Sequence, residues 1–119
     1  MKKPRFSTEI AKDMEPHAER VAQFLKGMAS PHRLIILCQL SGGERSVTQL
    51  ITATGIAQTS MSQHLAKLRT EGIVSVRRDH RTLFYAIEHP MADALMQVLH
   101  DYFCAPMEAT DQTPTKEPT

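Results

Sequence analysis

Apolar residues recur at helical spacing over two consecutive stretches near the start of the chain. The first, about residues 15–29, predicts an amphipathic helix with an apolar side formed by Ala18, Val21, Ala22, Leu25 and Met28. Ser30 and Pro31 then predict a second start, because serine caps helices and proline suits the first helical turn. This second helix, about residues 31–40, is apolar on nearly all sides, which is typical of a helix at the centre of a core.

The next stretch predicts two helices joined by a short connection. Ser46 is a candidate cap for a helix over residues 47–54, and Gly55 ends it. A longer helix over about residues 58–71 follows, and Gly72 ends it. The buried side of this longer helix is formed by Met61, Leu65 and Leu68, at positions i, i+4 and i+7.

After these helices the pattern changes from helical to alternating. Val74 and Val76 occupy every second position of one short stretch, and Leu83 and Tyr85 do the same in the next. This period is typical of strands, and the polar residues 79–81 between the two stretches predict a hairpin turn.

A last helix is predicted from Pro90 to about Cys104. Its apolar side holds Met91, Leu95, Val98, Leu99 and Tyr102. The polar residues 1–13 predict a flexible N-terminus, and the Pro/Thr-rich residues 106–119 predict a disordered tail. The expected fold class is therefore mainly α with a small β-hairpin. Five helices and a two-stranded antiparallel wing, in this order, indicate a winged helix-turn-helix that forms one domain over residues 14–105.

Composition limits the classes of protein that this chain can be. It has 119 residues, of which 41% are hydrophobic and 5% aromatic, enough for one small core. Two cysteines do not form a disulfide framework, and the basic start MKKPRF lacks the apolar run of an export signal. No stretch approaches the roughly 20 apolar residues of a membrane span. We therefore expect a cytoplasmic protein with reduced thiols and no membrane partner.

The net charge of +1 conceals an uneven distribution along the chain. Residues 58–86 contain five basic and two acidic side chains, a net of +3, so the remainder of the chain sums to −2. A basic segment in an otherwise balanced protein favours an anionic partner for that segment.

A helix, a short turn, a second helix and a charged hairpin, in this order, are typical of proteins that place the second helix in the major groove of DNA. Glutamine pairs with adenine, serine and threonine suit bases or phosphates, and basic residues contact the DNA backbone. The candidate DNA-binding residues are Gln58, Thr59, Ser60, Ser62, Gln63, His64, Lys67 and Arg69 on the helix and Arg77, Arg78 and Arg81 on the hairpin. On one isolated helix such side chains more often form a solvated surface, but their combination with the hairpin favours double-stranded DNA as the partner.

The segments KGMASPHRLIILCQL and SQHLAKLRTEGIV, followed by the hairpin RRDHRTLFY, resemble the ArsR family of bacterial winged-helix repressors. The resemblance covers about residues 18–104. It implies a homodimer formed by the first and last helices, a palindromic operator, and an inducer that releases the DNA. One position departs from the family pattern. Ala57 stands where a serine usually caps the recognition helix, which is the predicted helix over about residues 58–71.

Metal-sensing members of this family carry ligand sets that this chain lacks. The segment RSVTQL before the recognition helix contains no cysteine. On the last helix Asp93 and His100 are present, but Leu95 and Phe103 occupy positions where further ligands would be needed. Since two ligands do not enclose a zinc ion, we expect neither a metal site nor another cofactor.

The two cysteines, Cys38 and Cys104, admit more than one interpretation. Alone, a cysteine within the apolar run LIILCQL is most often core filler. The resemblance extends to the persulfide- and oxidant-sensing branch of the family, which has a cysteine on each of these two helices. It implies that Cys38 and Cys104 are a redox-sensing pair, and that linking the two thiols releases the repressor from its operator.

Other functions stay open from the sequence alone. The same DNA-binding fold could lack thiol sensing and be metal-responsive through an unrecognised site, or be an activator that displaces another DNA-binding protein. A small thiol enzyme is a remote alternative, because the chain has no Cys-x-x-Cys motif, no glycine-rich cofactor loop and no evident base beside either cysteine. We therefore expect a transcriptional regulator rather than an enzyme.

Overall fold

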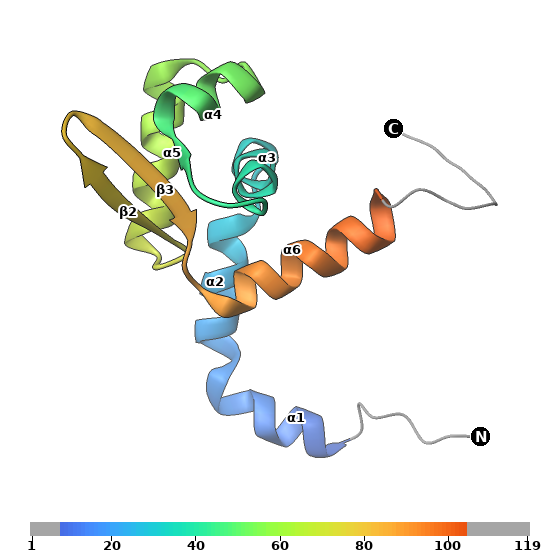
Figure 1. The fold of residues 1–119 in the computed structure, drawn as a ribbon. Coiled ribbons are helices and arrows are strands. Elements are labelled where there is room, and N and C mark those ends of the chain that lie inside the picture. Colours follow the sequence, from blue (N-terminus) through green and yellow to red (C-terminus); the bar gives the residue numbers. More distant parts are fainter. Residues whose placement is uncertain (1–7, 105–119) are drawn as a thin grey trace, which may run out of the picture.

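The computed structural model describes residues 8–104. In chain order the elements are α1 (Thr8–Met14), the 3₁₀ turn η1 (Glu15–His17), α2 (Ala18–Met28), α3 (Pro31–Leu40), β1 (Arg45–Ser46), α4 (Val47–Thr54), α5 (Gln58–Thr70), β2 (Val74–Asp79), β3 (Thr82–Ile87) and α6 (Pro90–Phe103). The mainly helical fold with an antiparallel hairpin is as predicted, and the hairpin projects from the body beside α5 (Figure 1). The predicted tail over residues 106–119 lies outside the described residues.

The core lies between α3, α4, α5 and the sheet. The largest side chains that are fully buried are Ile36, Leu37, Leu50, Met61, Leu65, Leu68, Ile73 and Val74. α3 was predicted to lie at the centre of the core, and one side of this helix is indeed buried there. Its other side, with Ile35 and Cys38, is exposed.

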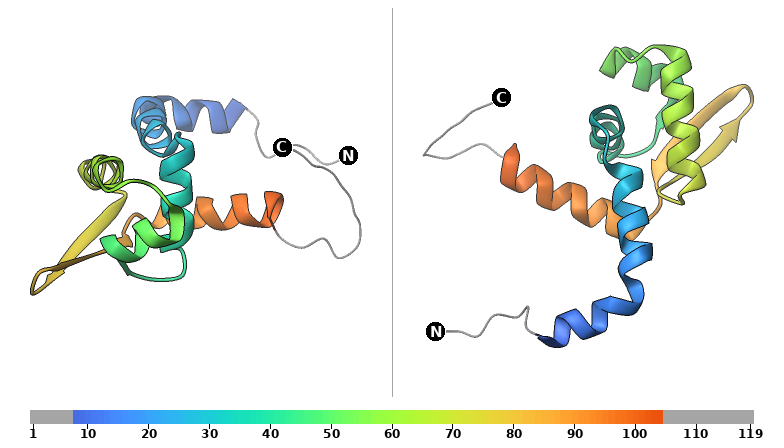
Figure 2. Two further views of the ribbon diagram at one scale, coloured as in Figure 1. Left: turned by 90° about the horizontal axis from the view of Figure 1, so that it is seen from above. Right: turned by 180° about the vertical axis from the view of Figure 1, so that it is seen from behind.

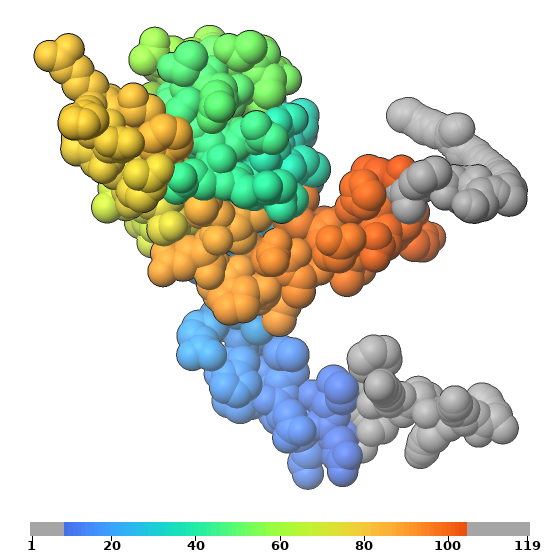
Figure 3. Space-filling view, viewed as in Figure 1, coloured from blue at the N-terminus to red at the C-terminus, as the bar shows by residue number. Residues whose placement is uncertain are grey.

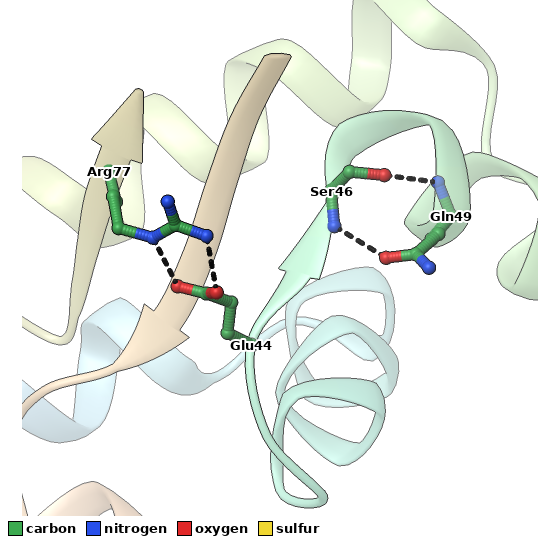
Figure 4. Close-up of polar contacts among 4 residues, drawn as sticks. All are labelled: Glu44, Ser46, Gln49 and Arg77. Carbon is green, nitrogen blue, oxygen red and sulfur yellow. Dashed lines mark hydrogen bonds and ion pairs between the residues drawn. The ribbon is translucent and has the colours of Figure 1, made fainter. Parts of the chain in front are cut away.

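Side-chain caps fix where α3 and α4 begin. The hydroxyl of Ser30 accepts a hydrogen bond from the backbone N–H of Arg33 (3.3 Å). At α4 the bonds are reciprocal, because Ser46 Oγ accepts from the N–H of Gln49 (3.1 Å) and Gln49 Oε1 accepts from the N–H of Ser46 (2.8 Å) (Figure 4). At the other end of α4, Gly55 has a φ of +76°, which glycine adopts without strain.

Replacing Ser46 by alanine is expected to lower the free energy of unfolding by about 1 kcal/mol, because the N–H of Gln49 loses its acceptor. Urea unfolding followed by circular dichroism measures this change. Thr48→Ala, at an exposed position two residues further along, is the matched control and should change the free energy by about 0.5 kcal/mol or less. Equal losses in the two variants would show that the capping box does not stabilise α4.

The predicted hairpin is present, together with a third strand that the sequence pattern did not reveal. β2 and β3 pair antiparallel along their full lengths, and His80 in the turn has a φ of +60°. On its other edge β3 pairs with β1, with Arg45 opposite Tyr85 and Ser46 opposite Phe84, so the strand order is β1-β3-β2. A strand of two residues has no alternation to read, so only its pairing with β3 identifies it.

Of the N-terminus that was predicted to be flexible, residues 1–7 lie outside the described part of the chain, whereas the remainder forms a helix. The chain from Thr8–Met14 is helical, and its apolar side is marked only by Ile10 and Met14. Pro16 lacks an N–H and cannot continue an α-helix, so the chain passes through η1 before α2 begins. The polar composition of this segment concealed a short helix, and the predicted helix from about residue 15 is correspondingly shorter.

α6 extends away from the body of the domain (Figures 1, 2 and 3). Much of its apolar side is exposed. Ala92 and Met96 are buried against the core, whereas Val98 and Tyr102 are 60% and 81% exposed. An uncovered stripe of this kind is typical of a helix that packs against another chain. None of the helices within residues 8–104 is long and apolar enough to cross a membrane.

Candidate DNA-binding surface and cysteine pair

The buried side of α5 determines which of its side chains face solvent. Met61, Leu65 and Leu68 are fully or almost fully buried, as predicted, and they hold the helix against the core. No side chain caps the start of α5 at Ala57, although the carbonyl of Ala57 accepts the N–H of Met61 (2.8 Å). The candidate DNA-binding residues that remain exposed on α5 are Gln58, Thr59, Ser62, Gln63, Lys67 and Arg69, whereas Ser60 and His64 are partly buried.

His64 lies on the side of α5 that faces α3. Its ring contacts the ring of His32 edge to face, with the centroids 5.3 Å apart. Burial lowers the pKa of His64, and the positive charges of Arg33 and His32 lower it further. We therefore expect a neutral imidazole that sits between the two helices, which separates His64 from the outward-facing candidates.

The three candidate arginines of the wing have different surroundings. Arg77 donates two hydrogen bonds to Glu44, from Nε to Oε2 (3.0 Å) and from Nη2 to Oε1 (2.7 Å) (Figure 4). Its guanidinium also lies 4.6 Å from the ring centroid of Phe84. The hydrogen bond to Arg77 lowers the pKa of Glu44 and raises that of Arg77. Arg78 and Arg81 are exposed on the hairpin. No local pattern in the sequence indicates the role of Glu44, because this residue lies 33 positions from Arg77.

Arg81→Ala is expected to weaken DNA binding for all sequences and to reduce the slope of log affinity against log salt by about 1, because one phosphate contact is lost. Arg77→Ala should reduce the slope less, since Glu44 already neutralises that guanidinium. Fluorescence anisotropy over a salt series measures both slopes. An equal reduction in the two variants would show that the ion pair opens on DNA.

The two cysteines are both free and both exposed. The interpretation of Cys38 as core filler is therefore wrong, because this thiol lies on the uncovered side of α3. Cys104 follows the last residue of α6, where its N–H bonds to the carbonyl of His100 (2.8 Å). Burial raises the pKa of Cys38, and the negative charge of an ionised Cys104 raises it further. The two thiols are thus close enough for the charge of one to affect the other.

The histidines and acids of the last helix do not form a metal cluster. Within residues 8–104 the structure contains no group of three or more His, Cys, Asp or Glu side chains that could hold a metal ion. His100 Nδ1 instead lies 3.8 Å from Asp101 Oδ1 on the surface of α6.

Residues 30–76 match the sequence profile of bacterial regulatory proteins of the arsR family. The HTH-type transcriptional regulator YgaV of Escherichia coli (strain K12) is 38% identical to this chain over 98 residues, which are 82% of this chain and 98% of YgaV. This chain belongs to the ArsR family.

Other ArsR-family members match over similar lengths. The transcriptional activator HlyU of Vibrio cholerae is 37% identical over 92 residues, 77% of this chain and 85% of HlyU. The crystal structure of the transcriptional repressor BigR from Xylella fastidiosa has a TM-score of 0.76 at 41% identity, covering 81% of this chain and 98% of that chain. The predicted family and winged-helix fold are confirmed, and this ArsR-family protein is a transcriptional regulator.

Proposed function

We propose that this ArsR-family protein is a homodimeric repressor that binds a palindromic operator through α5 and the wing, and that linkage of Cys38 to Cys104 releases it. The observation that carries the thiol part is the pair of free, exposed cysteines on α3 and at the end of α6, together with a pKa of Cys38 that is raised by burial and by an ionised Cys104. α3 contacts the recognition helix through His32 and His64, and α6 carries the uncovered apolar stripe. A bond between α3 and α6 would therefore join the DNA-binding part to the dimerisation part.

The DNA-binding part of the proposal rests on the exposed amides and hydroxyls of α5. Gln58 and Gln63 can pair with adenine, and Thr59 and Ser62 can donate to bases or phosphates. Because no side chain caps α5, the first N–H groups of the helix are open to a DNA phosphate.

Gln63→Ala tests the base-reading role of α5. We expect operator affinity to fall at least tenfold, which lies within the about 1–3 kcal/mol that a bidentate base contact contributes to discrimination against the wrong base. Affinity for unrelated DNA should stay nearly constant, since phosphate contacts are unaffected. Anisotropy titrations on the operator and on a scrambled duplex measure both, and an equal loss on the two duplexes would exclude Gln63 as a base-reading residue.

The dimer is proposed from apolar side chains that one chain leaves uncovered. α1 and α6 extend from the same side of the body (Figures 1 and 2). The uncovered apolar side chains of α1, α2 and α6 are Ile10, Met14, Val21, Leu25, Met91, Val98, Tyr102 and Phe103. Single exposed hydrophobic residues are common, but several on helices that project from the core indicate an interface. A second copy related by a two-fold axis would cover them and match a palindromic operator.

The thiol chemistry needs an oxidant, and a low-molecular-weight persulfide, RSSH, supplies it. We expect Cys104 to react first, because the raised pKa of Cys38 keeps that thiol protonated. The thiolate of Cys104 takes the outer sulfur and releases RS⁻. The thiolate of Cys38 then attacks the inner sulfur of that persulfide and displaces HS⁻, which leaves a disulfide. If both cysteines carry persulfides, their condensation with loss of H₂S gives a trisulfide, which spans more than the about 7 Å that limits a disulfide.

A second candidate function is activation, because HlyU is a transcriptional activator at 37% identity. The DNA-binding surface would be the same, and the regulator would displace another DNA-binding protein from the promoter. A reporter gene behind the operator distinguishes the two, since deletion of the regulator raises expression under repression and lowers it under activation.

A further inference from the structure

A cavity of about 330 Å³ lies where α2, the start of α3 and the end of α5 meet. Its charged lining comes from all three helices: Lys26 of α2, Arg33 of α3, and Lys67 and Glu71 at the end of α5. Three cations and one carboxylate give this lining a net charge of +2. The volume is at the lower end of the range of small-molecule sites, about 300–1,000 Å³.

The single carboxylate of the cavity is already engaged. Gln23 Nε2 donates to both oxygens of Glu71, at 3.2 and 3.4 Å. Within residues 8–104, Lys26, Arg33 and Lys67 have no carboxylate within ion-pair distance. The positive charge of the cavity is therefore not cancelled by its own wall.

The position of Arg33 is fixed by contacts with α2. Its Nη1 donates to the carbonyl of Gly27 (2.9 Å), while its Nε is buried and has no hydrogen-bond partner among the described residues. A Cβ at Gly27 would lie 3.2 Å from Glu71 Cγ and 3.3 Å from Ile73 Cδ1, so the glycine permits the close approach of α2 to the end of α5. The cationic cavity thus has a tightly packed wall, and one of its cations has an unused donor.

The positive charge of this region also affects a side chain of α5, the recognition helix. His64, one turn before Lys67 on α5, has a pKa lowered by burial and by the charges of Arg33 and His32. A bound anion would counteract the effect of Arg33 and raise the pKa of His64.

We propose that Lys26, Arg33 and Lys67 form a binding site for a phosphate-type oxyanion on the side of the recognition helix that faces α2 and α3. The guanidinium offers directed donors and the two lysines offer point charges, a combination that suits a tetrahedral oxyanion with two or more charges. Two sources share this chemistry: a free small molecule that carries phosphate groups, and a phosphate of bound DNA. This site is separate from the cysteine pair and does not depend on the thiol switch.

Inorganic pyrophosphate is the probe, titrated into the full-length protein by calorimetry in the absence of DNA and at constant ionic strength. We expect saturable binding of one pyrophosphate per chain. Lys26→Gln and Lys67→Gln should each weaken it at least tenfold, whereas Lys12→Gln on α1, which removes the same charge elsewhere, should bind as the wild type does. Lys26 and Lys67 are exposed, so both variants should fold, and circular dichroism verifies this.

NMR titration of the His64 ring gives an independent readout, because its pKa should rise when pyrophosphate is bound. Absence of saturable binding to the wild type would overturn the proposal, and so would an equal loss of binding in Lys12→Gln. Since no DNA is present, these outcomes are independent of whether the protein represses transcription.

Operator binding then distinguishes the two sources of the oxyanion. If a DNA phosphate occupies the site, pyrophosphate competes with the operator at matched ionic strength, and Lys26→Gln alone weakens operator binding. If a free oxyanion occupies it, Lys26→Gln loses pyrophosphate binding while its operator affinity without pyrophosphate stays within twofold. Either result supports an oxyanion site and identifies its occupant.

Discussion

Treatment with a low-molecular-weight persulfide is expected to weaken operator binding by the wild-type protein at least tenfold, about 1.4 kcal/mol. The Cys38→Ser and Cys104→Ser variants should not respond, because neither can link α3 to α6. Anisotropy titration before and after treatment, with intact mass recorded on the same samples, measures the response. The mass should show loss of two hydrogens for a disulfide, or that loss with added sulfur for a longer bridge.

The rate of linkage should depend on pH in a direction set by Cys38. Its pKa is raised above the ordinary thiol value of 9.0, so its thiolate fraction increases about tenfold for each pH unit up to that pKa. We expect the step that closes the bridge to accelerate correspondingly between pH 7 and 9. A wild-type protein that gains sulfur mass without losing affinity, or a Cys38→Ser variant that still responds, would exclude the thiol switch.

Val98→Glu is expected to convert the dimer into monomers and to lower operator affinity a hundredfold or more. Val98 is 60% exposed in one chain, so a glutamate at this position leaves the fold of the monomer intact. Burial of the glutamate charge between two chains costs roughly several kcal/mol. A monomer contacts only one half-site and loses the contribution of the second. Sedimentation velocity measures the association, and anisotropy measures the affinity.

Gln97→Glu is the matched control, because it adds the same charge at the preceding position, on the polar side of α6 where Gln97 bonds to Asp101. This variant should remain dimeric and bind the operator nearly as the wild type does. If Val98→Glu is still a dimer at the concentration used for DNA binding, the stripe on α6 is not the interface.

Local signals in the sequence were sufficient to predict most of the helices and the hairpin. Ser30 and Ser46 cap the helices that they were predicted to cap, and Gly55 ends α4 with a left-handed backbone. The change of period after α5 correctly predicted the hairpin. These features depend on residues within a few positions of one another, so a single sequence contains the information.

The features that were missed depend on residues far apart in the chain. β1 exists only through its pairing with β3, and Glu44 reaches Arg77 across 33 positions. The eleven candidate DNA-binding residues were chosen by side-chain chemistry, which could not show that His64 packs against His32 or that Arg77 is neutralised. The exposure of Cys38 was likewise hidden, because an apolar run does not reveal which of its sides the core leaves uncovered.

The attachment of β1 to the wing has a consequence for how the operator is released. β1 runs directly into α4, and the ion pair between Glu44 and Arg77 adds a second connection to the wing. The wing, α4 and α5 therefore form one rigid DNA-binding unit. A bridge between α3 and α6 would rotate the two DNA-binding units of a dimer relative to each other without deforming either. Their spacing relative to the helical repeat of DNA would change, while each unit would still fit a single half-site. The oxidised protein should therefore still bind an isolated half-site and lose only its preference for the palindrome.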